Sequence, residues 1–513
     1  MSFAIGIRLR ILLIQPPYDL QPDDARQAIP PLGLAYIAAV LEREGYDVRI
    51  VDCVVEDFHN LHPLPDGRRR HGLPLDGLSK IVEQYDPALV GVSCLFSSQA
   101  RVSHEVCALI KQITPDVVTV MGGAHPSATP RDTLDDPNID VVVIGEGELS
   151  MLRIARAVEC RAFPPSQAAG LAFRDRGNVV VNATAAKIEN LDQLPLPARH
   201  MLPMKKYFAY RSPHGGVVQR HPCTNMITSR GCPAKCCFCS IHNVWGRRFR
   251  CHSAARVVEE IETLMSEYGV REIQFEDDNL TLHKRRMQDI CRLIIDRGLD
   301  ITWSTPNGVA AYALDERLLA LMRAAGCRNI TLGIESGSQH TLKEIIGKPL
   351  RLEKVKPIVR ACRKLGLGVS AFFVIGFPGE TKDAIRQTID FACELDVDTL
   401  NFFTATPYPG TRLYDQCIEQ GLIRTPVDYG SLRIGRPLIS TSDWNAAELV
   451  EMAREAQARF YRSAARRHPV RFFSTVVSKF VREPLYITRK ARDVIFPRVQ
   501  LTRRRGADRV RIK

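Results

Sequence analysis

The sequence predicts an α/β protein with two successive parallel-sheet domains and a basic, mainly helical C-terminal extension. Short aliphatic runs alternate with amphipathic stretches twice along the chain, over residues 8–160 and 219–430. This alternation is typical of parallel sheets covered by helices. Basic residues gather near the C-terminus: residues 459–513 contain 17 Lys and Arg but three acids, in a chain of net charge +13. A length of 513 residues with 45% hydrophobic content accommodates two or three ordinary cores.

The first domain, residues 8–160, is predicted to be a Rossmann-like sheet. Helices with apolar residues at helical spacing, such as 32–44 and 99–113, separate the strands. The predicted strands are 10–15, 47–52, 89–93, 117–121 and 140–144. Ligands of such folds bind beyond the carboxyl ends of the strands. Loops rich in turn-forming and small residues stand there, although each alone could be an ordinary turn: 30–33, 93–98, 122–126 and 145–148.

Residues 161–218 are predicted to form a connector with a small β excursion from Ala169 to Val181. The alternation then resumes over residues 219–430, with helical spacers such as 255–268 and 314–325. The predicted strands are 224–229, 271–279, 301–306, 329–335, 368–376 and 398–403. Six βα units make a partial (β/α)6 barrel, and its open side leaves room for a large substrate or a second domain. Residues 431–513 form the basic extension.

The most informative residues are Cys232, Cys236 and Cys239, which follow the first barrel strand. Three thiolates at these spacings on a loop can hold three irons of a [4Fe–4S] cluster and leave the fourth iron open. A zinc site is the alternative, because Cys223, Cys237, Cys251 and His242 are near in sequence and zinc prefers four protein ligands. Cys237, between two ligands, is expected to point away and pack.

The pattern C-x3-C-x2-C, with Phe238 before the last cysteine, resembles the signature of the radical S-adenosylmethionine (SAM) superfamily. The resemblance implies that SAM binds the open iron and is cleaved to a 5′-deoxyadenosyl radical. It also implies SAM contacts at strand ends, where acids otherwise often cap the next helix. Those residues are Asp278 in the run 276–279, Glu335, and Gly376 with Glu380 in the run 376–380.

Together with the N-terminal loops, the chain resembles cobalamin-dependent radical SAM enzymes over most of residues 8–440. The resemblance implies that Leu95, Phe96 and Ser97 meet the lower face of the corrin. No D-x-H-x-x-G motif is present, so cobalamin is expected to bind without a protein histidine on cobalt. The remaining cobalamin candidates are loop residues, of which His125 could equally be solvated or capping and the two acids could be helix caps: Gly122, Gly123, His125, Gly145, Glu146, Gly147 and Glu148.

The resemblance implies a methyltransferase that moves a methyl group from SAM, via methylcobalamin, to an unactivated carbon of a substrate radical. The alternative is a cyclase or rearrangement enzyme with the same cofactors and no net methyl transfer. A cobalamin-binding sensor would keep the N-terminal loops but would not need the three cysteines. The substrate is expected to be a small molecule, a lipid or a carrier-bound group, and the electron donor a flavodoxin or ferredoxin.

The basic tail permits several interpretations: a solvated run of charge, docking on an acidic carrier or on the barrel mouth, or contact with anionic lipid. Nucleic acid is not expected, because the basic residues are not joined to a recognisable reader fold. No apolar run approaches the roughly 18 residues that span a bilayer. Scattered cysteines and an oxygen-sensitive cluster favour a reducing compartment, and therefore the cytoplasm.

Overall fold

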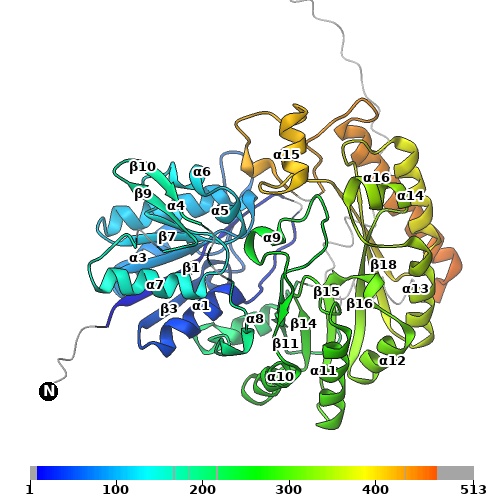
Figure 1. The fold of residues 1–513 in the computed structure, drawn as a ribbon, viewed down its shortest axis with the longest axis horizontal. Helices are drawn as coiled ribbons and strands as arrows, with labels where there is room; N and C mark the ends of the chain where they lie inside the picture. The colour runs from blue at the N-terminus through cyan, green and yellow to red at the C-terminus, as the bar shows by residue number, and fades with distance from the viewer. Residues whose placement is uncertain are drawn as a thin grey trace, which may run out of the picture.

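The computed structural model describes residues 8–470 except 23, 166–167, 184, 186, 215–217 and 434. It contains two large sheets with helices packed on them, and Figure 1 shows the first domain, in blue and cyan, beside a larger domain in green to orange. The α/β class and the order of the two domains predicted from the sequence are confirmed.

The first sheet has the order β10-β9-β8-β7-β6-β1-β3. Its five parallel strands match the predicted ones within a residue or two: β1 (Arg10–Gln15), β3 (Asp47–Asp52), β6 (Leu89–Ser93), β7 (Val118–Gly122) and β8 (Val141–Val143). The antiparallel hairpin β9 (Leu171–Asp175) and β10 (Asn178–Val181) extends the sheet beyond β8. The predicted β excursion after residue 161 therefore belongs to this sheet.

Helices cover both faces of the first sheet, as in other doubly wound folds. One face packs against α1 (Leu32–Arg43) and α7 (Glu148–Glu159), and the other against α3 (Leu75–Tyr85) and α4 (Ala100–Ile113). Short elements complete the domain: α2 (Cys53–Glu56), η1 (Ser97–Gln99), α5 (Ala124–Ala128), α6 (Pro130–Leu134), and the small sheet of β2 (Tyr18–Leu20), β5 (Arg69–His71) and β4 (Leu61–Pro63).

The second sheet is parallel throughout, with the order β11-β14-β15-β16-β17-β18. The six strands are those expected from the sequence: β11 (Cys223–Met226), β14 (Glu272–Phe275), β15 (Thr302–Val309), β16 (Cys327–Glu335), β17 (Gly368–Ile375) and β18 (Thr399–Thr404). The helices outside the sheet are α10 (Ala254–Tyr268), α11 (Lys284–Asp296), α12 (Glu316–Ala324), α13 (Val355–Lys364) and α14 (Lys382–Glu394). β11 and β18 remain edges, so the barrel is open.

The two faces of the barrel sheet differ in chemistry. Alternate residues such as Ile273, Trp303 and Leu400 join the apolar core beneath the helices. The residues between them are polar and buried, and they face the hollow side of the sheet: Gln274, Thr302, Ser304, Asn329, Thr331, Ser370 and Thr399. The barrel therefore presents a polar inner wall.

Three connections join the domains. α8 (Met204–Tyr210) packs its Tyr207 into the core of the first domain. Arg199 in η3 (Arg199–Met201) forms a buried ion pair of 3.0 Å with Glu260 on α10. After β18 and α15 (Arg412–Glu419), the chain returns to the first domain through η7 (Tyr429–Ser431) and then forms α16 (Ala446–Arg467). Within the described part of the chain, no helix is both long and apolar enough to cross a membrane.

Candidate functional site

The cluster loop begins directly after the two-residue strand β12 (Ser229–Arg230), which pairs with β13 (Arg250–Cys251). Gly231 turns the chain with a φ of +85°, and a Cβ there would lie 2.3 Å from the Arg248 carbonyl oxygen. Phe238 packs near the ring of Phe377 after β17, with centroids 5.9 Å apart. Because the loop is held at both ends, the cysteines have a defined position at the carboxyl edge of the barrel.

The surroundings of the three predicted ligands fit an iron–sulfur cluster. Cys232, Cys236 and Cys239 are partly exposed, whereas Cys237 is 3% exposed and packs in the core as expected. Among the described residues, no three His, Cys, Asp or Glu side chains converge on one point as a single zinc ion requires. A cubane cluster binds each thiolate to a different iron, so it does not need that convergence.

Two polar groups face this loop: Asn279, which belongs to the predicted run 276–279, and Tyr312, which the sequence reasoning missed. Asn279 donates to Tyr312 Oη (3.2 Å) and lies 3.9 Å from Cys232 Sγ. Its Oδ1 atom is buried and has no partner in the described structure. A buried acceptor without a partner needs a donor, so Asn279 is suited to a ligand beside the cluster.

Glu335 ends β16 in a strained conformation, with a φ of +71° that side chains rarely adopt. Its Oε1 accepts from the buried Lys348 at 3.0 Å, and this carboxylate raises the pKa of Lys348 against the effect of burial. The second oxygen of Glu335 remains available for an ammonium or hydroxyl group. The predicted role of Glu335 toward SAM stays a prediction that this geometry suits.

The residues of the run 276–279 have different surroundings and partners. Glu276 accepts from His214 at 2.7 Å, and Asp277 accepts from the Thr228 side chain at 2.7 Å, which fixes the chain before the cluster loop. Asp278 stays accessible to solvent, yet desolvation by surrounding protein and the neighbouring Asp277 raise its pKa to about 7. Asp278 and Asn279 are therefore the members of the run that are suited to meet a ligand.

The SAM contact expected after β17, at Gly376 and Glu380, lies in a tightly built turn. Glu380 accepts from the backbone of Gly376 (2.7 Å) and Phe377 (3.2 Å), and Trp444 donates to its carbonyl oxygen. Burial raises the pKa of Glu380 to about 7, although these backbone bonds oppose the shift. These contacts give Glu380 a supporting role within the turn.

The loops at the carboxyl edge of the first sheet offer an apolar platform. Leu95 and Phe96 are 51% and 49% exposed, unusual for such large apolar side chains. Gly123 has a φ of +122°, and a Cβ there would lie 2.5 Å from the Cys94 carbonyl oxygen, so two loops approach by their backbones. An exposed apolar pair beside closely packed loops fits the face of a planar corrin.

His125 is buried beneath this platform. Its Nδ1 lies 3.1 Å from Ser97 Oγ, its Nε2 lies 3.5 Å from Thr129 Oγ1, and its ring packs edge-on against Tyr429. Burial lowers the pKa of His125 to about 4. Both ring nitrogens therefore have protein partners, and the cobalamin contact expected of His125 stays a prediction.

Glu146 and Glu148 meet the arginines that flank the cluster loop. Glu148 Oε1 lies 2.5 Å from Arg230 Nη2, and Glu146 Oε1 lies 2.5 Å from Arg250 Nη2. Gly145 and Gly147 allow close packing, because a Cβ would meet Lys187 Nζ at 2.7 Å and Ile37 Cδ1 at 2.6 Å respectively. A cobalamin role for these four residues remains a prediction. The signal in the sequence that could have indicated this contact with the arginines is the pair of acids, because neither has a basic partner nearby in the chain.

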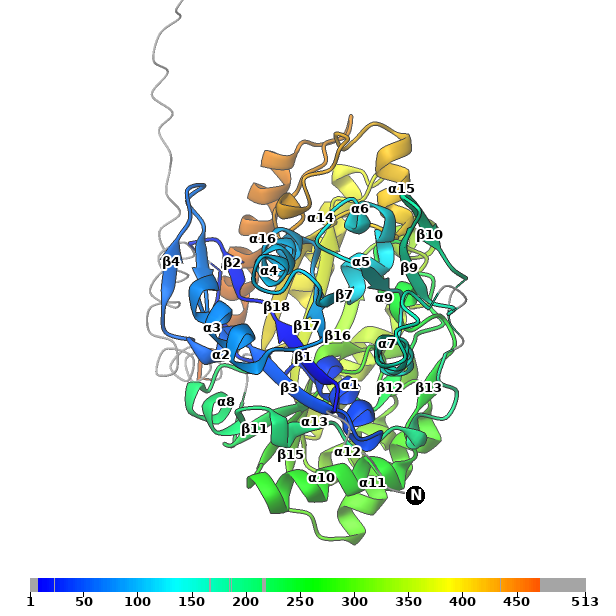
Figure 2. The same cartoon turned by 90° about the vertical axis from the view of Figure 1, so that its left-hand side faces the viewer.

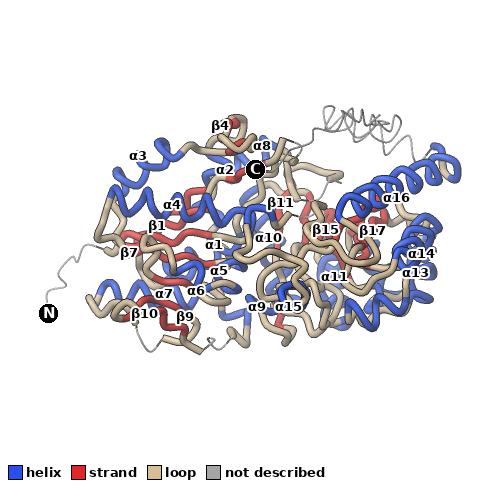
Figure 3. Tube along the Cα trace, turned by 90° about the horizontal axis from the view of Figure 1, so that it is seen from above, coloured by secondary structure: helices blue, strands red, loops and turns tan. Residues whose placement is uncertain are grey.

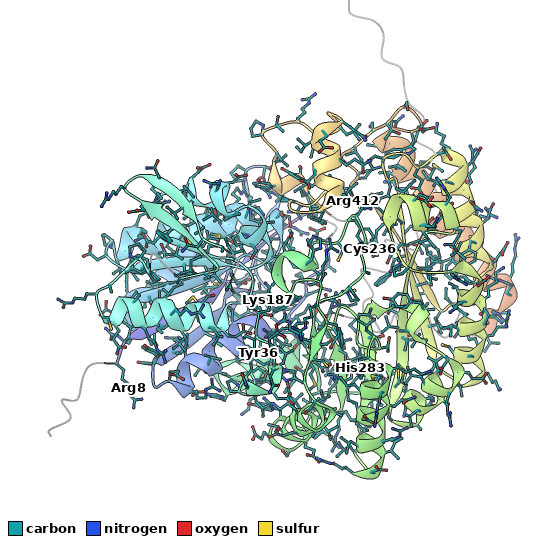
Figure 4. The ribbon with its side chains drawn as sticks, viewed as in Figure 1. Arg8, Tyr36, Lys187, Cys236, His283 and Arg412 are labelled. Carbon is teal, nitrogen blue, oxygen red and sulfur yellow. The ribbon has the colours of Figure 1, made fainter. Side chains whose placement is uncertain are left out.

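A small cavity, partly open to solvent, lies between the first domain and the inner wall of the barrel. Its lining comes from residues 28–30, from α8 and the chain after it, and from β11 and β14. Among the lining side chains, Arg211, His214 and His221 can carry positive charge and none is acidic. Figure 4 places Tyr36 and Lys187 at the junction of the domains and Cys236 on the barrel side of it.

Comparisons with known proteins agree with this division. The family model of the B12 binding domain matches residues 23–155, and that of the radical SAM superfamily matches residues 226–392. The chain is 35% identical to cytidylyl-2-hydroxyethylphosphonate methyltransferase of Streptomyces wedmorensis, over 86% of this chain and 88% of that protein. It is 28% identical to the anaerobic magnesium-protoporphyrin IX monomethyl ester cyclase of Cereibacter sphaeroides, over 90% and 71% of the two chains.

Solved structures share the fold. The radical SAM methyltransferase TsrM of Kitasatospora setae, with tryptophan and a SAM analogue bound, aligns with a TM-score of 0.65 at 21% identity, covering 81% of this chain and 77% of TsrM. The cobalamin-dependent enzyme OxsB aligns with a TM-score of 0.67 at 16% identity, covering 92% and 72%.

The two domains and the cluster loop thus define an enzyme that uses an iron–sulfur cluster with SAM beside a corrin-binding domain. The chain belongs to the cobalamin-dependent radical SAM methyltransferases, and its cofactors are a [4Fe–4S] cluster, SAM and cobalamin.

Proposed function

We propose that this enzyme methylates a carbon atom of a small, polar, anionic substrate held between the first domain and the barrel. The observation that carries the substrate class is the lining of the small cavity, which contains Arg211, His214 and His221 and no acid. The Glu276 carboxylate raises the pKa of His214 although burial opposes the shift, which favours the charged imidazolium. Cations in a partly enclosed site attract anions more strongly than cations in bulk water do.

The neutral part of the lining supports a polar substrate. Asn225 lines the cavity, and its Oδ1 atom is buried without a partner in the described structure, while its Nδ2 donates to the Pro30 carbonyl oxygen. Gln274 stands beside it on β14. A lipid would leave the Asn225 carbonyl oxygen unsatisfied, at a cost of about 1–3 kcal/mol for a buried group.

When bound, the cofactors supply a 5′-deoxyadenosyl radical from SAM and a methyl group carried by cobalamin. The protein itself positions the bound cofactors and substrate and shields them from solvent. Leu95 and Phe96 provide an apolar floor for the corrin, and Glu335, held by Lys348, presents one carboxylate oxygen beside the cluster. Asp278, with a pKa near neutrality, can hold or release a proton at its carboxyl group.

Cyclisation without methyl transfer is the second candidate, since the chain also resembles cyclases over 90% of its length. The products separate the two. Methyl transfer yields both S-adenosylhomocysteine and 5′-deoxyadenosine, whereas hydrogen abstraction without methylation yields 5′-deoxyadenosine alone.

The test is anaerobic reconstitution with methyl-labelled SAM and a panel that includes cytidylyl-2-hydroxyethylphosphonate, tryptophan and an apolar lipid. We expect label in a product of the anionic compound or of an analogue of equal charge. Label only in neutral or apolar compounds would reject the proposed substrate class, and a product without label would favour the cyclase alternative.

Arg211→Ala provides a sharper test, because it removes one cation from the lining. We expect the KM for the anionic substrate to rise about tenfold or more, since a hydrogen bond to a charged group contributes about 1.5–3 kcal/mol. Lys205→Ala is the control: Lys205 is exposed on the same α8 helix and does not line the cavity. Equal KM values for the two variants would contradict the role of Arg211.

A flavodoxin- or ferredoxin-type electron donor and a cytoplasmic location form part of the same proposal. Reduction of the cluster requires an electron carrier of low potential, and an oxygen-sensitive cluster survives best in a reducing compartment.

A further inference from the structure

We propose that Glu146, Glu148, Arg230 and Arg250, here called the inter-domain clamp, set the position of the cluster loop relative to the cobalamin-binding loops. All four are positioning residues. Two belong to the loop after β8 of the first domain, and two belong to the β12–β13 pair beside the cluster loop. In Figure 2, β12 and β13 lie close to α7, the helix that begins at Glu148.

The clamp is buried and electrically balanced. The side chains are 2% to 6% exposed, and two carboxylates face two guanidinium groups. Arg230 pairs with Glu148 at 2.5 Å and approaches Glu146 at 3.7 Å, while Arg250 pairs with Glu146 at 2.5 Å. Charges this deeply buried must keep their partners, so relative movement of the two loops would break strong contacts.

Further contacts define the direction of each guanidinium group. Arg230 lies over the ring of Trp245 at 4.5 Å and over the ring of Tyr36, on α1, at 5.5 Å. Arg250 donates to the carbonyl oxygens of Ile188 (2.7 Å) and Trp245 (2.9 Å). The second oxygen of Glu146 accepts from the Ile188 backbone at 2.9 Å. The planar arginines therefore have one orientation each.

The path from the clamp to both cofactor sites is short. Arg230 is two residues before Cys232, with only the constrained Gly231 between them. Glu146 and Glu148 are in one of the loops expected to meet the corrin, and α5 of the neighbouring corrin loop packs against α9 (Ile241–Val244), which follows Cys239. A buried ion pair often contributes little net stability compared with apolar residues of similar size. Here the clamp restricts the cluster loop and the cobalamin-binding loops to one relative arrangement.

The experiment compares three variants of the reconstituted holoenzyme. Glu148→Gln removes one charge of the clamp without changing its size, and Glu148→Asp keeps the charge but shortens its reach. Glu260→Gln is the matched control, because Glu260 forms an equally buried ion pair with Arg199 across the domains, away from the cluster loop. The main measurement is the magnetic interaction between Co(II) and the reduced cluster by electron paramagnetic resonance, which needs no substrate.

We expect both Glu148 variants to bind iron and hydroxocobalamin in wild-type amounts and to show a weaker or broader magnetic interaction, with Glu260→Gln unchanged. An interaction like that of the wild type in a fully loaded Glu148→Asp or Glu148→Gln protein would overturn the proposal. A loss of cobalamin affinity by tenfold or more, with the magnetic interaction unchanged in the loaded fraction, would also overturn it and assign Glu148 to the corrin directly. If the Glu148→Gln protein does not bind iron and hydroxocobalamin, the magnetic interaction in Glu148→Asp alone decides between these outcomes. Because no substrate is present, the result is independent of the proposed substrate class.

Discussion

Cys236 and Cys237 are neighbours in the chain, but their surroundings are opposite. Cys237 is 3% exposed, its N–H donates to the Ile346 carbonyl oxygen at 2.8 Å, and its own carbonyl accepts from Leu413 at 3.0 Å. Cys236 lies near Lys348. Burial raises the pKa of the Cys236 thiol, and the positive charge of Lys348 opposes that shift. The backbone bonds of Cys237 hold the loop in the orientation that exposes its neighbours, so Cys237 belongs to the core and Cys236 stays the predicted ligand.

Replacement of each loop cysteine by Ala tests this division. We expect Cys232→Ala, Cys236→Ala and Cys239→Ala to lose the cluster and to form no 5′-deoxyadenosine, because each loss removes one of three ligands. Cys237→Ala is the control and should keep about four irons per chain, at a stability cost of about 1–2 kcal/mol for the small cavity. Iron content and 5′-deoxyadenosine yield are the measurements. An inactive Cys237→Ala together with an active Cys239→Ala would contradict the ligand assignment.

At the scale of elements, the long buried strands were predictable and the short ones were not. Strands such as Arg10–Gln15 and Gly368–Ile375 contain runs of apolar and β-branched residues, so their approximate bounds follow from composition. β2, β4 and β5 have three residues each, and Tyr18 pairs with the distant His71. Such pairing depends on tertiary contacts that no local pattern contains.

The same reason explains which site residues were predictable. The cysteine spacing and the strand-end glycines are local patterns, so Cys232 or Gly123 could be singled out from the sequence. Tyr312 and Lys348 reach the cluster loop from segments more than 70 residues away, and nothing in their own neighbourhood marks them. Long-range contacts of this kind become visible only once the fold is known.

Residues 428–433, here called the strap, return the chain from the barrel to the first domain. Tyr429 packs on His125 and donates to Asp132, and Leu432 is 1% exposed. Arg433 pairs with Asp24 at 2.9 Å and donates to the Asp19 carbonyl oxygen at 2.9 Å. The strap thus ties the end of the barrel to the loops below the corrin platform.

Removal of the arginine tests the strap. We expect Arg433→Ala to release bound cobalamin about tenfold faster while iron content stays unchanged, because losing hydrogen bonds to a charged group costs about 1.5–3 kcal/mol. Arg424→Ala, which removes an exposed cation from the chain just before the strap, is the control. Stopped-flow exchange with labelled cobalamin measures the rate. Identical rates in the two variants would show that the strap does not support the corrin site.

At the scale of the whole molecule, the C-terminal extension has two parts with different chemistry. α16 packs against β18 and α14, and its Phe460 is fully buried in the barrel core. Figure 3 shows α16 beside α14. Arg467 donates to the carbonyl oxygens of Cys393 (2.7 Å) and Glu394 (3.1 Å). If the tail docks on the barrel, as one interpretation of the sequence has it, Phe472, Phe473 and Tyr486 are the residues expected to pack there. Residues 471–513 lie outside the described part of the chain, so this packing stays a prediction. Residues 471–513 contain 13 Lys and Arg but three acids.

Two truncations separate these parts. A chain ending at residue 458 loses Phe460 and the Arg467 contacts, and we expect it to be insoluble or without cluster, because loss of one buried Phe costs about 3–5 kcal/mol. A chain ending at residue 470 keeps α16 and should be soluble with a full cluster.

If the basic tail recruits an acidic carrier or lipid, the 1–470 chain will show a raised KM for the true substrate and unchanged SAM cleavage without substrate. Salt should produce the same KM change in the full chain, since charges are screened beyond about 8 Å at physiological ionic strength. A soluble, cluster-bearing 1–458 chain would contradict the packing role of α16, and a 1–470 chain with unaltered kinetics would leave the tail an ordinary solvated end.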